Sequence, residues 1–194
     1  MLVTDDRWVR GRDLLPLALA AQRGGITSLQ VRLKEKTARE LVELVRVLVA
    51  GLTVPVLVND RPDIALAAGA AGVHVGPDDM PVDLVRRIAP QGFIIGASVG
   101  SAGEAERGAA ADYWGVGPWA DTATKGDAGS ALGSEGFRRI VALAGGKPCI
   151  AIGAVRPGDV PSVISAGGAG VAVVSGILGA DDVERAARTY RAAG

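Results

Sequence analysis

The sequence predicts an α/β protein, a single (β/α)8 TIM barrel of parallel strands that spans residues 1–194. Eight short apolar runs alternate with eight segments of helical composition, which is typical of a parallel sheet. Each run is apolar along its whole length, as expected of strands that are buried on both faces. No linker divides the 194 residues, a length sufficient for one well-packed domain. An open, doubly wound sheet is the alternative that these patterns leave.

The first half of the chain supplies four strand–helix units. Apolar runs predict strands at residues 2–4, 26–31, 54–58 and 72–75. Helices are predicted at residues 14–22, 37–50, 62–70 and 81–89, between glycine, proline and capping boundaries. The clearest boundary is Thr37, because Glu40 follows three residues later and the two can form a capping box.

The second half repeats the pattern four times. Strands are predicted at residues 93–97, 113–116, 148–152 and 170–174. Ser101, Ser134 and Asp181 are expected to cap three of the following helices, and Pro157 is expected to begin the remaining one. Eight strand–helix repeats are the number that closes a barrel of this type.

Composition argues against several classes of protein. The formal net charge is zero, which disfavours a nucleic-acid-binding surface. The single cysteine excludes an internal disulfide, and Cys149 lies in an apolar run where a buried, unreactive thiol is expected. No secretion signal or membrane-spanning run is visible, so we expect a cytoplasmic protein without membrane contact. The sequence leaves open whether the protein forms a homo-oligomer.

Polar residues gather where the predicted strands end. In a barrel of parallel strands these carboxyl ends lie on one face, which carries the active site. Arg32 and Lys34 place cations there, and Asn59 and Ser98 add uncharged polar groups. The glycine-rich turns at 152–154 and 174–176 follow the last two strands, where such barrels commonly hold a phosphate on backbone amides.

Residues 115–125 carry the densest set of ligand-type groups. Two glycines and a proline end any regular element there, and Thr122, Thr124 and Lys125 follow within a few residues. Hydroxyl and ammonium donors suit an anion, and glycine allows the backbone to approach it closely. The segment therefore predicts a ligand with several negative charges, such as a phosphorylated small molecule, although a solvated loop remains an alternative.

Two carboxylates, Asp60 and Asp79, follow neighbouring predicted strands on this cationic face. Magnesium is commonly held by one or two carboxylates together with substrate phosphates, so the pair predicts a Mg²⁺ site. Other roles remain open. Asp60 could pair with Arg61 or with a nearby lysine, and Asp79 could cap the helix that begins at Pro81.

Other catalytic centres are not expected. His74 is the only histidine and lies inside a predicted strand, where a packed and hydrogen-bonded role is the common one. A zinc site is disfavoured because no cluster of histidines and cysteines accompanies it. Ser98 has no adjacent base and no G-x-S-x-G motif surrounds it, so a serine nucleophile is not expected.

The motifs in their order resemble thiamine phosphate synthase. They are Gln-Val-Arg-Leu-Lys at 30–34, Val-Asn-Asp-Arg at 58–61, Gly-Val-His-Val-Gly at 72–76 with Asp79, Gly-Ala-Ser at 96–98, Gly-Val-Gly-Pro at 115–118 with Thr-Ala-Thr-Lys at 122–125, and Val-Val-Ser-Gly at 173–176. The resemblance covers essentially the whole chain. Its most specific part is the Thr-x-Thr-Lys segment that follows Gly-x-Gly-Pro.

The resemblance implies a magnesium-dependent barrel enzyme that joins 4-amino-2-methyl-5-hydroxymethylpyrimidine diphosphate to a thiazole phosphate, giving thiamine phosphate and diphosphate. In that family the diphosphate leaves first and the thiazole nitrogen attacks the resulting cation, which calls for charge neutralisation rather than for a strong base. By position, the pyrimidine diphosphate would be held by Gln30, Arg32, Lys34, Asn59, Ser98 and Lys125, and magnesium by Asp60 and Asp79. The thiazole phosphate would be held by Thr122, Thr124, Ala154, Val174 and Ser175. Lys125, Arg32 and Ser98 would act in catalysis.

Three positions depart from the family pattern and keep alternatives open. Leu33 stands where glutamate is usual, which removes a carboxylate from the rim, and Ala154 stands where a second glycine is usual. Gly100 lies near the usual position of a histidine. The related thiazole tautomerases use a histidine in that region, so Gly100 disfavours their activity. A sugar-phosphate isomerase would need an acid–base pair that the sequence does not place well. A catalytically idle relative that binds thiamine precursors or a protein partner would be supported by Leu33 and Ala154.

Overall fold

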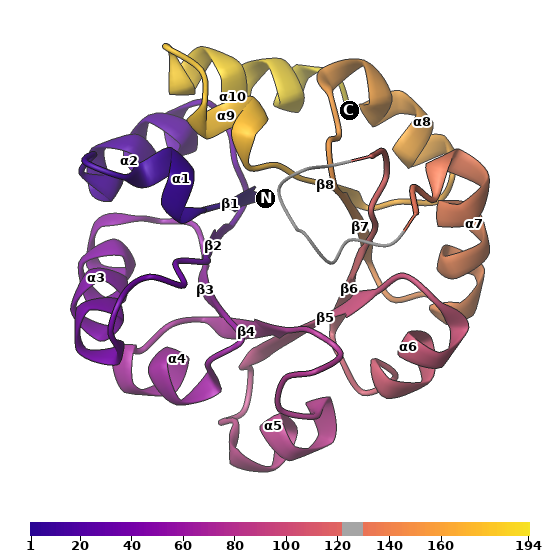
Figure 1. Cartoon of the computed structure of the whole chain (residues 1–194), viewed down its shortest axis with the longest axis horizontal. Coiled ribbons are helices and arrows are strands. Elements are labelled where there is room, and N and C mark those ends of the chain that lie inside the picture. The colour runs from indigo at the N-terminus through magenta and orange to yellow at the C-terminus, as the bar shows by residue number, and fades with distance from the viewer. Residues whose placement is uncertain (122–129) are drawn as a thin grey trace.

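Eight parallel strands form a ring with helices around it (Figure 1). The computed structural model describes residues 1–121 and 130–194, so Thr122, Thr124 and Lys125 lie outside the described residues. The strands are β1 (Leu2–Val3), β2 (Leu29–Val31), β3 (Val56–Asn59), β4 (Gly72–Val75), β5 (Ile94–Val99), β6 (Tyr113–Val116), β7 (Cys149–Ile152) and β8 (Gly170–Ala172).

Strand pairing closes the ring. The strands pair in chain order from β1 to β8, and every pair is parallel. A parallel bridge between Leu2 and Val173 then joins the last strand to the first, with the amide of Val3 donating to the carbonyl of Val173 at 2.9 Å. The predicted (β/α)8 barrel is therefore confirmed, and the open, doubly wound alternative is wrong.

The helices lie outside the ring (Figure 1). The long ones match the predicted segments and are α2 (Leu14–Arg23), α3 (Ala38–Gly51), α4 (Pro62–Ala68), α5 (Val82–Ile88), α6 (Ala102–Arg107), α7 (Gly133–Leu143), α8 (Val160–Ser165) and α10 (Val183–Ala192). Two four-residue helices, α1 (Asp6–Val9) and α9 (Ser175–Leu178), and a 3-10 turn at Pro157–Asp159 add to the prediction. None of the helices in the described part of the chain is long and apolar enough to cross a membrane.

Helix caps show where local sequence signals are reliable. The capping box of Thr37 and Glu40 forms as predicted, and Ser101 accepts a hydrogen bond from the amide of Glu104. The predicted caps at Ser134 and Asp181 are wrong. Helix α7 already begins at Gly133 without a side-chain cap. Asp182 caps α10, because its backbone is extended directly before the first turn and its side chain accepts a hydrogen bond from the amide of Arg185.

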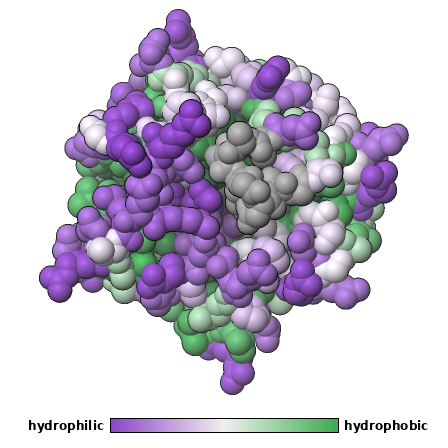
Figure 2. Space-filling model, in the orientation of Figure 1, coloured by the Kyte–Doolittle hydropathy of each residue, from purple (hydrophilic) through white to green (hydrophobic). Residues whose placement is uncertain are grey.

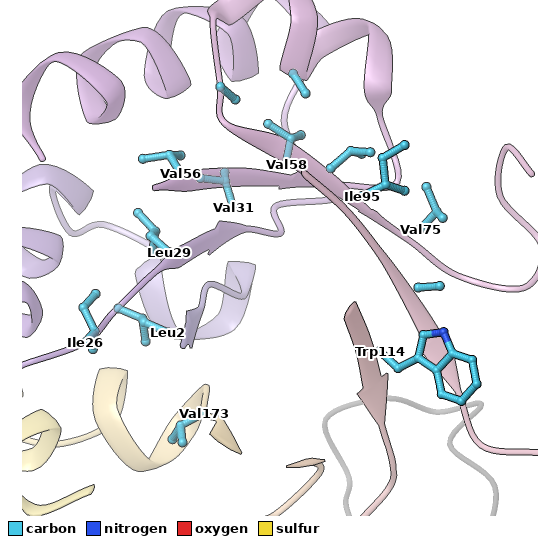
Figure 3. Packing of buried hydrophobic residues seen from close by; sticks show 14 of the residues in the cluster. Leu2, Ile26, Leu29, Val31, Val56, Val58, Val75, Ile95, Trp114 and Val173 are labelled. Atoms are coloured by element: carbon cyan, nitrogen blue, oxygen red, sulfur yellow. The ribbon is translucent and has the colours of Figure 1, made fainter. Parts of the chain in front are cut away.

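Successive side chains along each strand point alternately toward the helices and toward the inside of the ring. In β2 and β3 the side chains of Leu29, Val31, Val56 and Val58 join the main hydrophobic cluster under the helices (Figure 3), whereas Gln30 and Asn59 line the inside of the ring. Both faces are buried, which explains why the strands read as continuous apolar runs. Cys149 is buried as expected, and this burial raises the pKa of its thiol.

Candidate active site

A cavity of about 430 Å³ lies within the ring and opens at the carboxyl ends of the strands. Its size suits a small organic ligand. The predicted site residues that line it are Gln30, Arg32, Asn59, Ser98, Ala154, Val174 and Ser175. Seen in the orientation of Figure 1, hydrophilic side chains gather over α1 and the neighbouring ends of β1 to β3 (Figure 2). The topology thus brings into one place residues that are up to 145 positions apart in the sequence, from Gln30 to Ser175.

Arg32 follows β2 directly and is held in place by the end of β1. Its guanidinium Nη1 lies 2.8 Å from the carboxylate of Asp5, and only about 15% of either side chain is exposed. The hydroxyl of Thr4 accepts a hydrogen bond from the amide of Arg32 at 2.8 Å. A shielded cation whose backbone and guanidinium are both held in place is preorganised to meet an anion in the cavity.

Lys34 and Asp60 form a pair at the rim and are not among the described residues that line the cavity. Lys34 Nζ lies 3.7 Å from Asp60 Oδ2, with 62% of the lysine side chain exposed. This is one of the pairings that the sequence left open for Asp60. The other is wrong, because the guanidinium of Arg61 binds Asp63 at 2.6 and 2.8 Å.

The backbone of Asp60 is unusual. Its φ is +63°, a left-handed conformation that is uncommon for residues other than glycine. The amide of Asp60 donates to the carbonyl of His74 at 2.8 Å, which ties the loop after β3 to strand β4. Backbone strain of this kind is often found at functional sites.

Asp79 closes the turn after β4 rather than capping a helix. Its Oδ2 accepts a hydrogen bond from the amide of Gly76 at 2.7 Å. Helix α5 begins at Val82 with Pro81 at its N-cap and has no side-chain cap. The capping role that the sequence allowed for Asp79 is therefore wrong.

The donor chemistry of Asp60 and Asp79 is compatible with magnesium. Both are carboxylates in loops that follow neighbouring strands, and Mg²⁺ commonly takes one or two carboxylates and completes its shell with water and substrate phosphates. Among the described residues there is no group of three or more His, Cys, Asp or Glu side chains placed to hold a metal ion by themselves. A tightly caged protein site is thus absent from this part of the chain, while a site completed by a phosphorylated ligand fits it.

His74, Ser98 and Tyr113 form a hydrogen-bonded chain at the wall of the cavity. His74 Nε2 lies 3.0 Å from Ser98 Oγ, and His74 Nδ1 lies 2.9 Å from the phenol oxygen of Tyr113. The packed and hydrogen-bonded role expected for His74 is confirmed. The expectation that Ser98 has no adjacent base is wrong, because β4 and β5 bring the imidazole next to it although 24 residues separate the two in sequence.

Burial controls the charge state of the tyrosine. Tyr113 is 8% exposed, and desolvation raises the pKa of its phenol, an effect that the side-chain amide of Gln30 partly opposes. The phenol therefore stays protonated throughout the physiological range.

The turns after β7 and β8 present backbone to the cavity. Gly153 and Ala154 both have positive φ, +99° and +51°, which turns the chain sharply at the end of β7. After β8, Val174 is the N-cap of the short helix α9, and Ser175 and Gly176 begin its first turn. Amides in the first turn of a helix have no partner within the helix, so this end can donate to an anion.

The structure shows the surroundings of two of the three positions that depart from the family pattern, Leu33 and Gly100. Leu33 is 5% exposed and belongs to the hydrophobic cluster, so it does not stand at the rim among the ligand-facing residues. The carboxylate that the family usually has at this position is replaced here by a core side chain. Gly100 lines the cavity, and a Cβ atom on it would lie 2.9 Å from the carbonyl oxygen of Gly117. A histidine there would require the backbone to shift.

Part of the predicted site cannot be placed. Thr122, Thr124 and Lys125 lie outside the described residues, although Gly115, Gly117 and Pro118, which precede them, line the cavity. Sequence reasoning in turn missed Asp5, Tyr113 and Glu104 as groups at the site. Asp5 follows the first predicted strand directly, next to Thr4, and this position is the signal that could have found it.

Comparison with known proteins agrees with this geometry. A family model described as thiamine monophosphate synthase matches residues 1–177. The thiamine-phosphate synthase of Methanoculleus marisnigri is 44% identical over 98% of this chain and 92% of its own length, and that of Moorella thermoacetica is 45% identical over 93% and 88%. A solved structure, the thiamine phosphate pyrophosphorylase of Pyrococcus furiosus, superposes with a TM-score of 0.86 at 36% identity, covering 99% of this chain and 93% of that one.

Proposed function

The chain belongs to the thiamine monophosphate synthase family, and we propose that it joins hydroxymethylpyrimidine diphosphate to a thiazole phosphate with release of diphosphate. The observation that carries this proposal is the cavity, which is lined by a shielded cation, neutral polar groups and two amide-rich turns. Such a lining suits two phosphorylated substrates that bind side by side.

The chemistry required of the protein is charge neutralisation. As the bond between the pyrimidine methylene carbon and the diphosphate oxygen breaks, negative charge grows on the leaving group. Arg32 is preorganised by Asp5 and Thr4 to face that charge, and Ser98 is placed to donate a hydrogen bond to it. Gln30 and Asn59 provide amide groups that can orient the pyrimidine.

We assign the thiazole phosphate to the turns after β7 and β8. Ala154, Val174 and Ser175 line the cavity there, and α9 presents the amides of its first turn. The thiazole nitrogen would then attack the pyrimidine methylene cation from the side of the cavity that these turns line. Thr122, Thr124 and Lys125 keep their proposed contacts with the phosphates on the basis of the sequence.

Asp60 and Asp79 are the residues that would hold magnesium. When bound, the ion would supply positive charge to the leaving diphosphate. Lys34 stands 3.7 Å from Asp60 and would share this region of the rim with the diphosphate.

A thiazole tautomerase of the same superfamily is the second candidate, and the structure disfavours it. The histidine that such enzymes use has no counterpart at Gly100, where a side chain would collide with Gly117. A catalytically idle relative is supported by the departures at Leu33 and Ala154, whereas the retained Arg32, Asp60 and Asp79 speak against it. Cytoplasmic location remains a prediction, and the sequence leaves the oligomeric state open.

The direct test is a coupling assay with both substrates, with and without Mg²⁺, that measures thiamine phosphate and diphosphate separately. We expect the two products in equal amounts, and no product when either substrate is left out or the metal is chelated. Formation of a rearranged thiazole without coupling would favour the tautomerase. Binding of both substrates without any product would favour the idle relative.

A further inference from the structure

The chain Tyr113–His74–Ser98 links the floor of the cavity to one of its proposed ligand-binding hydroxyls. The three side chains come from β6, β4 and β5, and each ring nitrogen of His74 has a hydrogen-bonding partner. His74 is 8% exposed and Tyr113 equally so, which means that their hydrogen bonds form away from bulk water. Buried networks of this kind hold one arrangement of protons.

Two glycines make room for this chain. A Cβ atom on Gly96 would lie 2.2 Å from Tyr113 Cζ and 2.5 Å from His74 Nδ1. A Cβ atom on Gly115 would lie 2.9 Å from His74 Cε1. The interior of the barrel is thus shaped around the imidazole and the phenol, and any side chain at either glycine would displace them.

The order of donors along the chain determines where the hydroxyl proton of Ser98 points. Burial keeps the phenol of Tyr113 protonated, and the hydrogen bond that the structure gives this phenol is the one to His74 Nδ1 at 2.9 Å. A buried hydroxyl proton without an acceptor is costly, so the single phenol proton is directed at His74 Nδ1. A neutral imidazole that accepts at Nδ1 carries its own proton on Nε2 and donates it to Ser98 Oγ.

We propose that His74 is a positioning residue, held by Tyr113 as the neutral Nε2–H tautomer, and that it turns Ser98 into a hydrogen-bond donor aimed into the cavity. Because Nε2–H occupies a lone pair of the serine oxygen, the serine proton is left to donate to an anionic oxygen of the ligand. In the opposite arrangement, Ser98 would donate to the imidazole and present only lone pairs, which would repel an anion. The role of Ser98 as a donor to the ligand rests on the proposed function, whereas the tautomer of His74 does not.

The first test is spectroscopic and needs no substrate. The chain contains one histidine, so a long-range ¹H–¹⁵N spectrum of the uniformly ¹⁵N-labelled protein shows only one imidazole. We expect a protonated Nε2 and an unprotonated Nδ1 at neutral pH. A protonated Nδ1, or protons on both nitrogens, would overturn the proposal.

Variants test which neighbouring residue determines the tautomer of His74. Ser98→Ala should leave the Nε2–H tautomer unchanged, because Tyr113 still donates to Nδ1. Tyr113→Phe removes that donor while keeping the ring, and we expect the Nδ1–H tautomer to become populated. If Tyr113→Phe leaves the tautomer unchanged, Tyr113 does not control it and the proposal is wrong. Ile95→Val serves as the control for a general loss of packing in the barrel, because Ile95 is fully buried in the hydrophobic cluster. We expect this variant to keep the Nε2–H tautomer.

Kinetics test the consequence for catalysis. Tyr113→Phe should lower kcat of the coupling reaction by about 2- to 10-fold, the effect of one hydrogen bond, with KM for the thiazole phosphate unchanged. His74→Gln keeps an N–H group near Ser98 and should retain more activity than His74→Leu. The hydrogen-bonded residues Tyr113 and His74 are proposed to act through Ser98. Adding Tyr113→Phe to Ser98→Ala should therefore cause no further loss of coupling activity. Additive losses would mean that Tyr113 acts elsewhere. If wild-type protein shows no coupling, the proposed function fails, and the spectrum still decides the tautomer.

Discussion

Ala154→Gly tests how the turn after β7 is built. Ala154 has φ of +51°, and a left-handed backbone costs a residue with a side chain roughly 1–2 kcal/mol. Glycine removes this strain, but its greater freedom in the unfolded chain costs about 0.5–1 kcal/mol. Ala154 is exposed, so its methyl group adds little through burial. We therefore expect the free energy of unfolding to rise by about 0–1.5 kcal/mol, the difference between these terms.

The matched control is the reverse change at a similar position. Gly69 ends α4 with φ of +72°, and a Cβ atom there would have open space within 4 Å. Gly69→Ala should therefore lower stability by a similar amount through the backbone alone. For a chain of this size, 1 kcal/mol shifts Tm by about 2–4 °C, so calorimetry resolves both changes.

Activity provides the second readout. In the proposed site the amides near Ala154 face the thiazole phosphate, and glycine gives them more room. We expect coupling activity to stay the same or to increase. A lower Tm would show that the methyl group supports the fold, and the strain argument would then be wrong. Loss of activity in a fully folded variant would refute the placement of the phosphate at this turn.

Three further predictions concern the rim and the interior. Asp60→Ala and Asp79→Ala should each raise the Mg²⁺ concentration required for half-maximal coupling. If the magnesium dependence is unchanged in either variant, the replaced residue does not bind the metal. Its role would then be the structural contact, with Lys34 for Asp60 or with the amide of Gly76 for Asp79. Lys125→Ala should lower turnover by on the order of 10²–10³ with little change in Tm, and wild-type turnover would favour a solvated loop. The raised pKa of Tyr113 means that the unfolded chain loses the phenol proton first, so stability should fall as pH rises above about 10. Tyr113→Phe should make this alkaline loss shallower in chemical unfolding curves, and an unchanged slope would contradict the burial of the phenol.

The sequence by itself determined the architecture and the location of the site. Eight apolar runs separated by helical segments identify the parallel strands, and local signals such as Thr37 with Glu40 mark helix ends correctly. Because parallel strands all end on one face, the residues that follow them had to converge, and Gln30, Arg32, Asn59 and Ser98 do line one cavity. These features depend on short-range periodicity and on topology, which a sequence displays directly.

Only the tertiary structure decided which of these residues contact one another. The pairing of Arg32 with Asp5, of Lys34 with Asp60 and of His74 with Ser98 joins residues 24 to 27 positions apart. The helices α1 and α9 contain four residues each, too few to display a helical period. Contacts of this kind depend on strand register and side-chain direction, where a shift of one residue turns every side chain to the other face. The sequence therefore specifies the rim as a set of residues, while the register of the closed barrel selects the pairs within it.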